Sequence, residues 1–101
     1  MIVCNMTIKV QHHIGPEWLQ WHQQVYAPSM LATGLFADWK IFRLLEQDEA
    51  EGITWVVQYF ARSEEDYQHW LQEYAPQLRR LAYDKWGDRF IAFQTVMQVV
   101  N

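Results

Sequence analysis

The chain has 101 residues, half of them hydrophobic, which is enough to bury a core without disulfides or metals and too apolar for a disordered segment. The net charge of −4 and the single cysteine exclude a basic nucleic-acid footprint and an internal disulfide. No run approaches the roughly 18 apolar residues that a membrane helix needs, and the alternating N-terminus does not read as a signal peptide. We expect a single domain over residues 1–101 of a cytoplasmic protein, with no nucleic-acid or membrane partner.

The first half of the chain predicts a strand followed by a helix. Residues 2–14 alternate apolar and polar side chains, which is typical of a half-buried strand, and one face would carry Ile2, Cys4, Met6, Ile8 and Val10. Pro16 suits the first turn of a helix that ends at Gly34. Pro28 lies late in this helix, where it should kink the helix or start a second piece.

The second half predicts two strands, a helix and a last strand. Residues 35–47 have an irregular strand pattern that does not reveal which face is buried, and a polar loop at 48–52 leads into a third strand at 52–62. Ser63 and the three acidic residues after it are typical of a helix N-terminus. Apolar residues at helical spacing continue to Gly87, with an interruption at Pro76. Residues 89–100 form the final strand.

The resulting order βαββαβ predicts an α+β, ferredoxin-like fold, with a four-stranded antiparallel sheet and two helices on one face. On the third strand the residues expected to face the helices are Ile53, Trp55, Val57 and Tyr59. On the last strand they are Ile91, Phe93, Met97 and Val99, which leaves Phe90, Ala92, Gln94, Val96 and Gln98 on the open face. Because large exposed apolar patches usually mark interfaces, we predict a homodimer in which two open faces stack as a dimeric α/β barrel.

Polar side chains on the open face are the candidate ligand-binding groups. They are Asn5, Thr7, Gln58, Gln94 and Gln98. Inside a barrel lumen they could orient a small, partly apolar ligand. The alternative is that these amides hydrogen-bond across the dimer interface, because buried amides normally find partners.

The titratable residues give no catalytic or metal-binding pattern. His12 and His13 point to opposite faces near a strand end and are interpreted as surface residues, and His22 as a partly exposed helix residue. Cys4 is interpreted as a core thiol, because reactive thiols need an exposed, electropositive setting. No spacing of His, Cys, Asp and Glu is typical of a metal site. We therefore predict no catalytic residue, metal or cofactor.

Several segments carry a resemblance to known proteins. IVCNMTIKV, EWLQW, ATGLF, FRLLEQ and VVQYFARSEEDYQHWLQEYAP resemble an uncharacterised bacterial domain-of-unknown-function family over essentially the whole chain. More distantly, the strand followed by SEEDYQHWL is similar to the dimeric α/β-barrel superfamily, which includes antibiotic-biosynthesis-type monooxygenases and haem-degrading enzymes. Many of these have an aromatic-x-x-His pattern just inside the second helix. Here Tyr67 and Trp70 take those positions, and a shift of one residue turns His69 by about 100° toward solvent.

Two functions remain open from the sequence. The first is a dimeric barrel that binds a small, partly apolar molecule or serves as an interaction module. The second is a cofactor-independent monooxygenase-like enzyme that holds a small aromatic substrate, whose own ring activates oxygen. The absence of a general base from the predicted open face weighs against the enzyme. A pocket of about 300–1,000 Å³ would favour binding or catalysis, whereas a filled lumen would favour a structural role.

Overall fold

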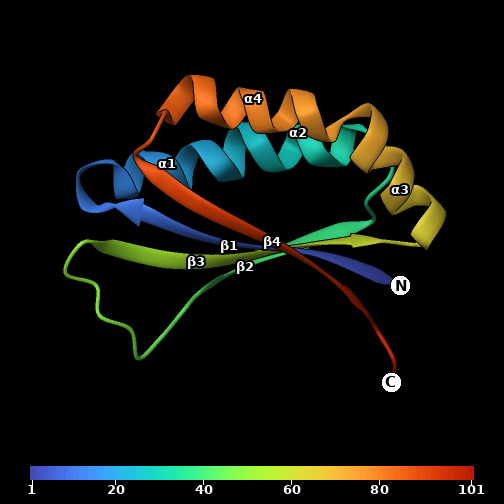
Figure 1. Cartoon of the computed structure of the whole chain (residues 1–101), viewed down its shortest axis with the longest axis horizontal. Coiled ribbons are helices and arrows are strands. Elements are labelled where there is room, and N and C mark those ends of the chain that lie inside the picture. The colour runs from blue at the N-terminus through green and yellow to red at the C-terminus, as the bar shows by residue number, and fades with distance from the viewer.

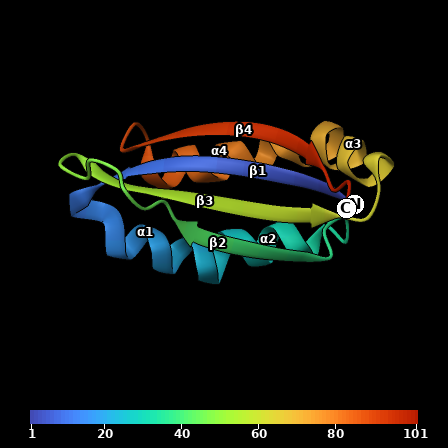
Figure 2. The ribbon, with the colours of Figure 1, turned by 90° about the horizontal axis from the view of Figure 1, so that it is seen from below.

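The computed structural model describes all residues from 1 to 101, in the order strand, helices, strand, strand, helices, strand (Figure 1). The strands are β1 (Ile2–Gln11), β2 (Asp38–Arg43), β3 (Gly52–Ala61) and β4 (Phe90–Gln98). They form one antiparallel sheet in the order β2-β3-β1-β4. All the helices cover one face of this sheet, and Figure 2 looks onto the uncovered face. The predicted α+β, ferredoxin-like fold is therefore confirmed.

The first helical segment is interrupted just before its proline. It consists of the 3-10 turn η1 (His12–Ile14), the helix α1 (Gly15–Trp21), the π-helical turn η2 (His22–Tyr26) and the helix α2 (Ala27–Ala32). Pro28 lies in the first turn of α2, where its missing N–H costs little. The backbone N–H of Ala27 bonds to the carbonyl of His22, five residues back, so η2 is wider than an α-helical turn.

The second helical segment is interrupted in the same way. It consists of α3 (Glu64–Glu73) and α4 (Ala75–Trp86), which are separated at Tyr74, with Pro76 in the first turn of α4. The hydroxyl of Ser63 accepts a hydrogen bond from the backbone N–H of Asp66 at 3.1 Å and so caps α3. The predicted interruptions at both prolines and the predicted N-terminus of this segment are confirmed.

The register of the sheet shows which side chains face the helices. Cross-strand partners in an antiparallel pair share a face, and β1 pairs with both β3 and β4. The helix-facing sets predicted for β1 and β3 are confirmed, because Cys4 lies opposite Tyr59 and Met6 opposite Val57. The second strand is shorter than the predicted range 35–47. The register turns its Trp39 toward the helices.

The orientation predicted for the last strand is wrong. Met6 pairs with Gln94 and Ile8 with Ala92, so the helix side of β4 carries Phe90, Ala92, Gln94, Val96 and Gln98. The open face carries Ile91, Phe93, Thr95 and Met97. The two sets are almost equally apolar, so burial alone does not decide between them. The amide of Gln94 finds hydrogen-bond partners on the helices, whereas Phe93 is left 67% exposed.

The core between the sheet and the helices is rich in aromatic side chains. Trp18, Tyr59 and Trp70 are essentially fully buried, and rings of this size contribute much of the apolar area that stabilises a small domain. Cys4 is fully buried as predicted, and burial raises the pKa of its thiol to about 12. None of the helices combines the length and apolar character that crossing a bilayer requires.

Candidate functional site: an apolar pocket between helices and sheet

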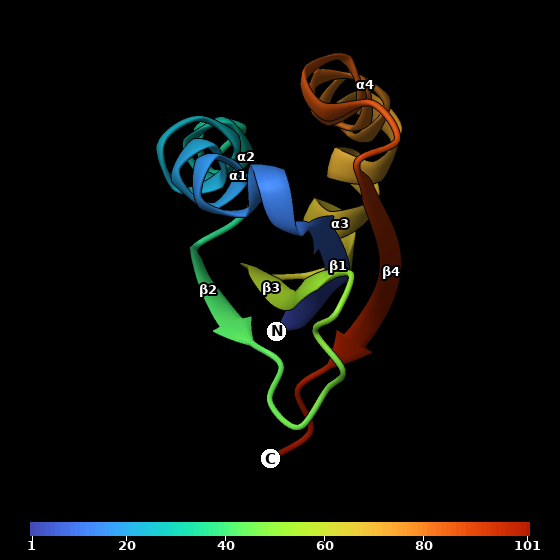
Figure 3. The same ribbon diagram turned by 90° about the vertical axis from the view of Figure 1, so that its left-hand side faces the viewer.

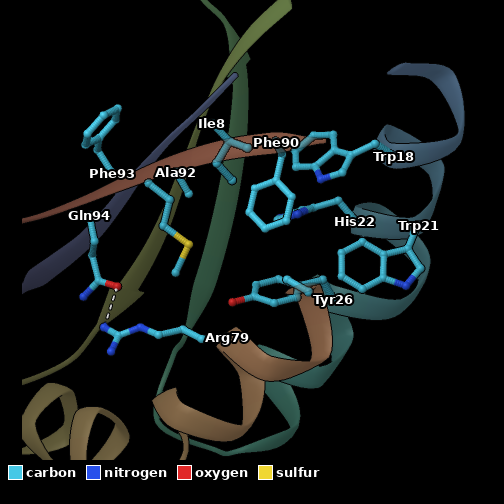
Figure 4. A pocket seen from close by; sticks show the side chains of 12 residues that line it. Ile8, Trp18, Trp21, His22, Tyr26, Arg79, Phe90, Ala92, Phe93 and Gln94 are labelled. Carbon is cyan, nitrogen blue, oxygen red and sulfur yellow. Dashed lines mark hydrogen bonds between the residues drawn. The ribbon is translucent and has the colours of Figure 1, made fainter. Parts of the chain in front are cut away.

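A pocket of about 350 Å³ lies between the sheet and the helices. Figure 3 shows α1 and α2 above one side of the sheet and α4 above the β4 side, and the pocket is lined from α1, η2, α4, β1 and β4. Nine of its twelve lining residues are hydrophobic, and the other three are His22, Arg79 and Gln94 (Figure 4). Small-molecule sites typically combine apolar walls with a few placed polar groups.

Two small side chains help to leave this space open. Ala92 on β4 lies opposite Ile8 of β1, and Ala82 on α4 also lines the pocket. A larger side chain at either place would add volume to the lining of the pocket. The size of the pocket is therefore set by side chains on two different elements.

One wall of the pocket is a row of three rings on the first helical segment. The ring centroid of His22 lies 4.9 Å from that of Trp18 and 5.0 Å from that of Tyr26. The three residues follow one another at four-residue spacing, and all are buried. The last two are the first and last residues of η2, and π-helical turns of this kind occur frequently at functional sites.

His22 is held in this wall by a hydrogen bond to the sheet. Its Nε2 lies 2.7 Å from the hydroxyl of Tyr59 on β3. Burial lowers the pKa of the imidazole to about 4, because the charged form is costly away from water, so the ring is neutral at pH 7. The prediction of a partly exposed His22 is wrong, since only 1% of the residue is exposed.

A chain of hydrogen bonds forms the polar end of the pocket. The Arg79 guanidinium donates to Oε1 of Gln94 at 3.3 Å, and Nε2 of Gln94 donates to the hydroxyl of buried Tyr67 at 3.0 Å. Burial raises the pKa of Tyr67 above its ordinary value. In Figure 4 the Arg79 side chain reaches from α4 toward Gln94 on β4, while the rings of Trp18, Trp21 and Phe90 gather away from the guanidinium.

The structure divides the five predicted ligand-binding residues between the two faces of the sheet. Asn5, Thr7 and Gln58 lie on the open face, and Gln94 and Gln98 lie on the helix side. Nδ2 of Asn5 donates to Oγ1 of Thr95 at 3.2 Å, and Nε2 of Gln58 donates to Oδ1 of Asn5 at 3.3 Å. These open-face amides thus bond to one another within one chain. Of the five residues, only Gln94 lines the pocket.

Sequence reasoning missed His22, Tyr26 and Arg79 as pocket residues. The repeat of aromatic rings at four-residue intervals from Trp18 to Tyr26 was the one local signal that His22 belongs to a buried stripe. Arg79 gave no such signal, because basic residues near the C-terminal half of a helix are ordinary.

Two other hollows are less suited to a small ligand. One, of about 460 Å³, is lined mostly by charged and polar residues that include Lys9, Glu51 and Asp88. The other, of about 400 Å³, lies where the end of β1 meets α1 and is lined by Val10, Leu19 and neighbouring residues. No three side chains of the metal-binding types His, Cys, Asp and Glu come together. The pocket beside His22 and Arg79 is therefore the candidate site.

A four-stranded antiparallel sheet with helices on one face and a pocket between them defines the class of protein as ferredoxin-like α+β. Within that class, the sequence matches the family "Domain of unknown function (DUF4286)" over residues 1–100, and the chain belongs to this family. The predicted resemblance to an uncharacterised domain family is thereby confirmed. None of the curated proteins matches the sequence.

Solved structures with the same fold come from several sources. An ethyl tert-butyl ether D (EthD) family protein from Bacillus halodurans superposes with a TM-score of 0.63 at 13% identity, over 99% of this chain and 100% of that one. A hydroxynitrile lyase from Passiflora edulis superposes with a TM-score of 0.62 at 14% identity, over 99% of this chain and 96% of that one. A dimeric ferredoxin-like protein of unknown function from Thermobifida fusca superposes with a TM-score of 0.55 at 11% identity, over 96% of this chain and 92% of that one. At these identities the likeness shows a shared fold.

Proposed function

We propose that the protein binds a small, partly apolar molecule in the pocket between its helices and its sheet. The observation that carries this proposal is an apolar pocket of about 350 Å³ with three polar side chains in its lining. This volume falls within the range of about 300–1,000 Å³ that is typical of ligand sites. The proposed site therefore lies on the helix side of the sheet and not in the predicted barrel lumen.

We also propose that the protein acts as a homodimer through the open face of the sheet. Four large apolar side chains on that face are 41–67% exposed, namely Phe42, Ile91, Phe93 and Met97. Exposed apolar side chains of this size on one sheet face favour an interface, and a second copy would bury the same residues on both chains. The Thermobifida fusca protein of the same fold is described as dimeric, which supports this arrangement.

Binding is favoured over the alternative of a cofactor-independent monooxygenase-like enzyme. Such a reaction needs a group that can take a proton at the working pH. The titratable base that lines the pocket is His22, whose pKa of about 4 makes it a weak base. Its Nε2 is also engaged by Tyr59.

The ligand proposal is tested by filling the pocket. Calorimetric titration with 2-naphthamide, a neutral and flat molecule, should show binding to the wild-type protein. Ala82→Phe on the pocket wall should weaken this binding by about tenfold or more, whereas Ala32→Phe on the exposed surface of α2 should leave it unchanged. Equal binding by the wild type and Ala82→Phe would place the ligand elsewhere and refute the proposal.

The dimer proposal is tested by light scattering after size-exclusion chromatography. The wild type should have the molar mass of two chains, and Met97→Glu on the open face should have the molar mass of one. Tyr83→Glu, on α4 and 64% exposed, adds the same charge away from that face and should remain dimeric. A monomeric wild type at micromolar concentration contradicts the proposal.

A further inference from the structure

We infer that the molecule bound in the pocket is a small carboxylate with a flat apolar body, whose carboxylate is held by Arg79. This inference rests on the proposed ligand-binding function and specifies the chemistry of its ligand. Four observations support it: the charge of the pocket, the free donors of Arg79, the way Gln94 positions it, and the separation of the charged end from the wall of rings.

The pocket is electropositive in an acidic protein. The chain carries a net charge of −4, yet no aspartate or glutamate lines the pocket, and Arg79 is the one lining residue that is charged at pH 7. His22 is neutral there, since its pKa is about 4. Arg79 is an exposed residue of α4, so an anion can reach its guanidinium from solvent.

Arg79 has no carboxylate partner, as is also true of Arg62 and Arg89, but it is the one arginine in the lining of the pocket. Arg43 makes two hydrogen bonds to Glu49, and Arg80 pairs with Asp84, whereas Arg79 takes part in no ion pair. Its one hydrogen bond goes to the neutral amide of Gln94. A guanidinium has five N–H donors, so most of those on Arg79 remain available for the bidentate contact that carboxylates make.

Gln94 fixes the direction of Arg79 without neutralising it. The amide nitrogen of Gln94 is committed to the hydroxyl of Tyr67, which turns the amide oxygen toward the guanidinium. A glutamate at position 94 could hold Arg79 equally well, but it would cancel the positive charge. The neutral amide therefore preserves a cation that is oriented and still able to bind an anion.

The charged end of the pocket lies apart from the wall of rings, to which neutral His22 belongs (Figure 4). Figure 4 shows the guanidinium of Arg79 beside Gln94, with the rings of Trp18 and Phe90 toward the other side. A molecule that spans the pocket would place a charged end at Arg79 and a flat body against those rings. This arrangement fits an aromatic carboxylate better than an uncharged molecule of the same shape.

The test compares two probes that differ in charge and hardly in shape. Calorimetry at pH 7.5 would measure the binding of 2-naphthoate and 2-naphthamide to the wild type, Arg79→Gln and Arg80→Gln. We expect 2-naphthoate to bind the wild type about tenfold more tightly or better. Arg79→Gln should abolish this preference. Arg80→Gln should keep it, because Arg80 is a highly exposed neighbour that pairs with Asp84.

Two further results separate the inference from the proposed function. If both probes bind the wild type equally and Arg79→Gln changes neither, the inference is overturned while the pocket remains a ligand site. If neither probe binds the wild type at millimolar concentration, the proposed function is overturned together with the inference. Arg79→Lys, which keeps the charge but loses the fork of donors, should retain only part of the preference for 2-naphthoate.

Discussion

The Nε2 of His22 and the hydroxyl of Tyr59 lie 2.7 Å apart and join the π-helical turn η2 to strand β3. Both residues are almost completely buried. Burial lowers the pKa of His22 to about 4 and raises that of Tyr59 well above its ordinary value. Both side chains are thus neutral at pH 7, and their hydrogen bond satisfies two polar groups within an apolar core.

The low pKa of His22 predicts that the protein loses stability between pH 6.5 and about 4. In this interval the imidazole takes up a proton in the unfolded chain, where its pKa is 6.5, but not in the folded chain. The unfolded state therefore binds more protons, and the free energy of unfolding falls as the pH falls. The neutral His22 of the folded chain thus lowers the free energy of unfolding by up to about 3 kcal/mol. The full loss is reached below pH 4, and there is none above pH 6.5.

Urea denaturation at a series of pH values between 7.5 and 4 measures this effect. His22→Gln removes the titrating group and should flatten the pH dependence in this interval relative to the wild type. His13→Gln, at an exposed position, should keep the wild-type slope. Identical slopes for the wild type and His22→Gln would show that His22 does not titrate differently on folding.

Tyr59→Phe should destabilise the protein even though it removes a single oxygen. The change leaves Nε2 of His22 buried without its partner, which costs about 1–3 kcal/mol of the free energy of unfolding. Tyr83→Phe is the matched control, because that ring is 64% exposed, and its effect should stay within about 0.5 kcal/mol. Equal midpoints of chemical denaturation for the two variants would contradict a structural role for the His22–Tyr59 bond.

Gly52→Ala should weaken the pairing of the two central strands. A Cβ at this position would lie 1.9 Å from the carbonyl oxygen of Val10, so β3 would have to move away from β1. Overpacking of this kind costs about 1–3 kcal/mol, measurable by thermal denaturation. Gly15→Ala meets no atom within 4 Å and has a helical backbone, so it should leave stability unchanged or raise it. A similar loss in both variants would refute the proposed clash.

Ser63→Ala should lower the free energy of unfolding by about 1 kcal/mol, because it removes the hydroxyl that caps α3. Ser29→Ala is a suitable control. The Ser29 hydroxyl donates to the carbonyl of Val25 within a helix, and such bonds do not stabilise helices. Circular dichroism during urea denaturation compares the two. A larger loss for Ser29→Ala than for Ser63→Ala would be inconsistent with the capping role.

Local patterns in the sequence were sufficient for much of the fold. The alternation along residues 2–14 predicted the buried face of β1, although residues 12–14 form the 3-10 turn η1 and not strand. Ser63 with its acidic neighbours predicted the start of α3. Both signals depend on residues close in sequence. The last strand could not be oriented in this way. Its two faces are almost equally apolar, and the contact that decides between them joins Gln94 to Tyr67, 27 residues earlier.

The pocket was hidden from the sequence for the same reason. In the sequence alone His22 looks like an ordinary helix residue, because its partner Tyr59 lies 37 positions away. Arg79 and Gln94 likewise meet only when α4 lies over β4. Helical and strand periodicity describes one element at a time, whereas each polar group of this pocket depends on a contact between elements.

The central place of β1 in the sheet has a consequence for synthesis of the chain. β1 comes first in the sequence, yet β3 follows only after the first helical segment and β2, and β4 only after α4. On the ribosome, the backbone N–H and C=O groups along both edges of β1 therefore stay unpaired until most of the chain has emerged, and such edges can pair with other chains. Residues 90–98 are the last to protect it, so a delay in their translation should prolong the interval in which the nascent protein can aggregate.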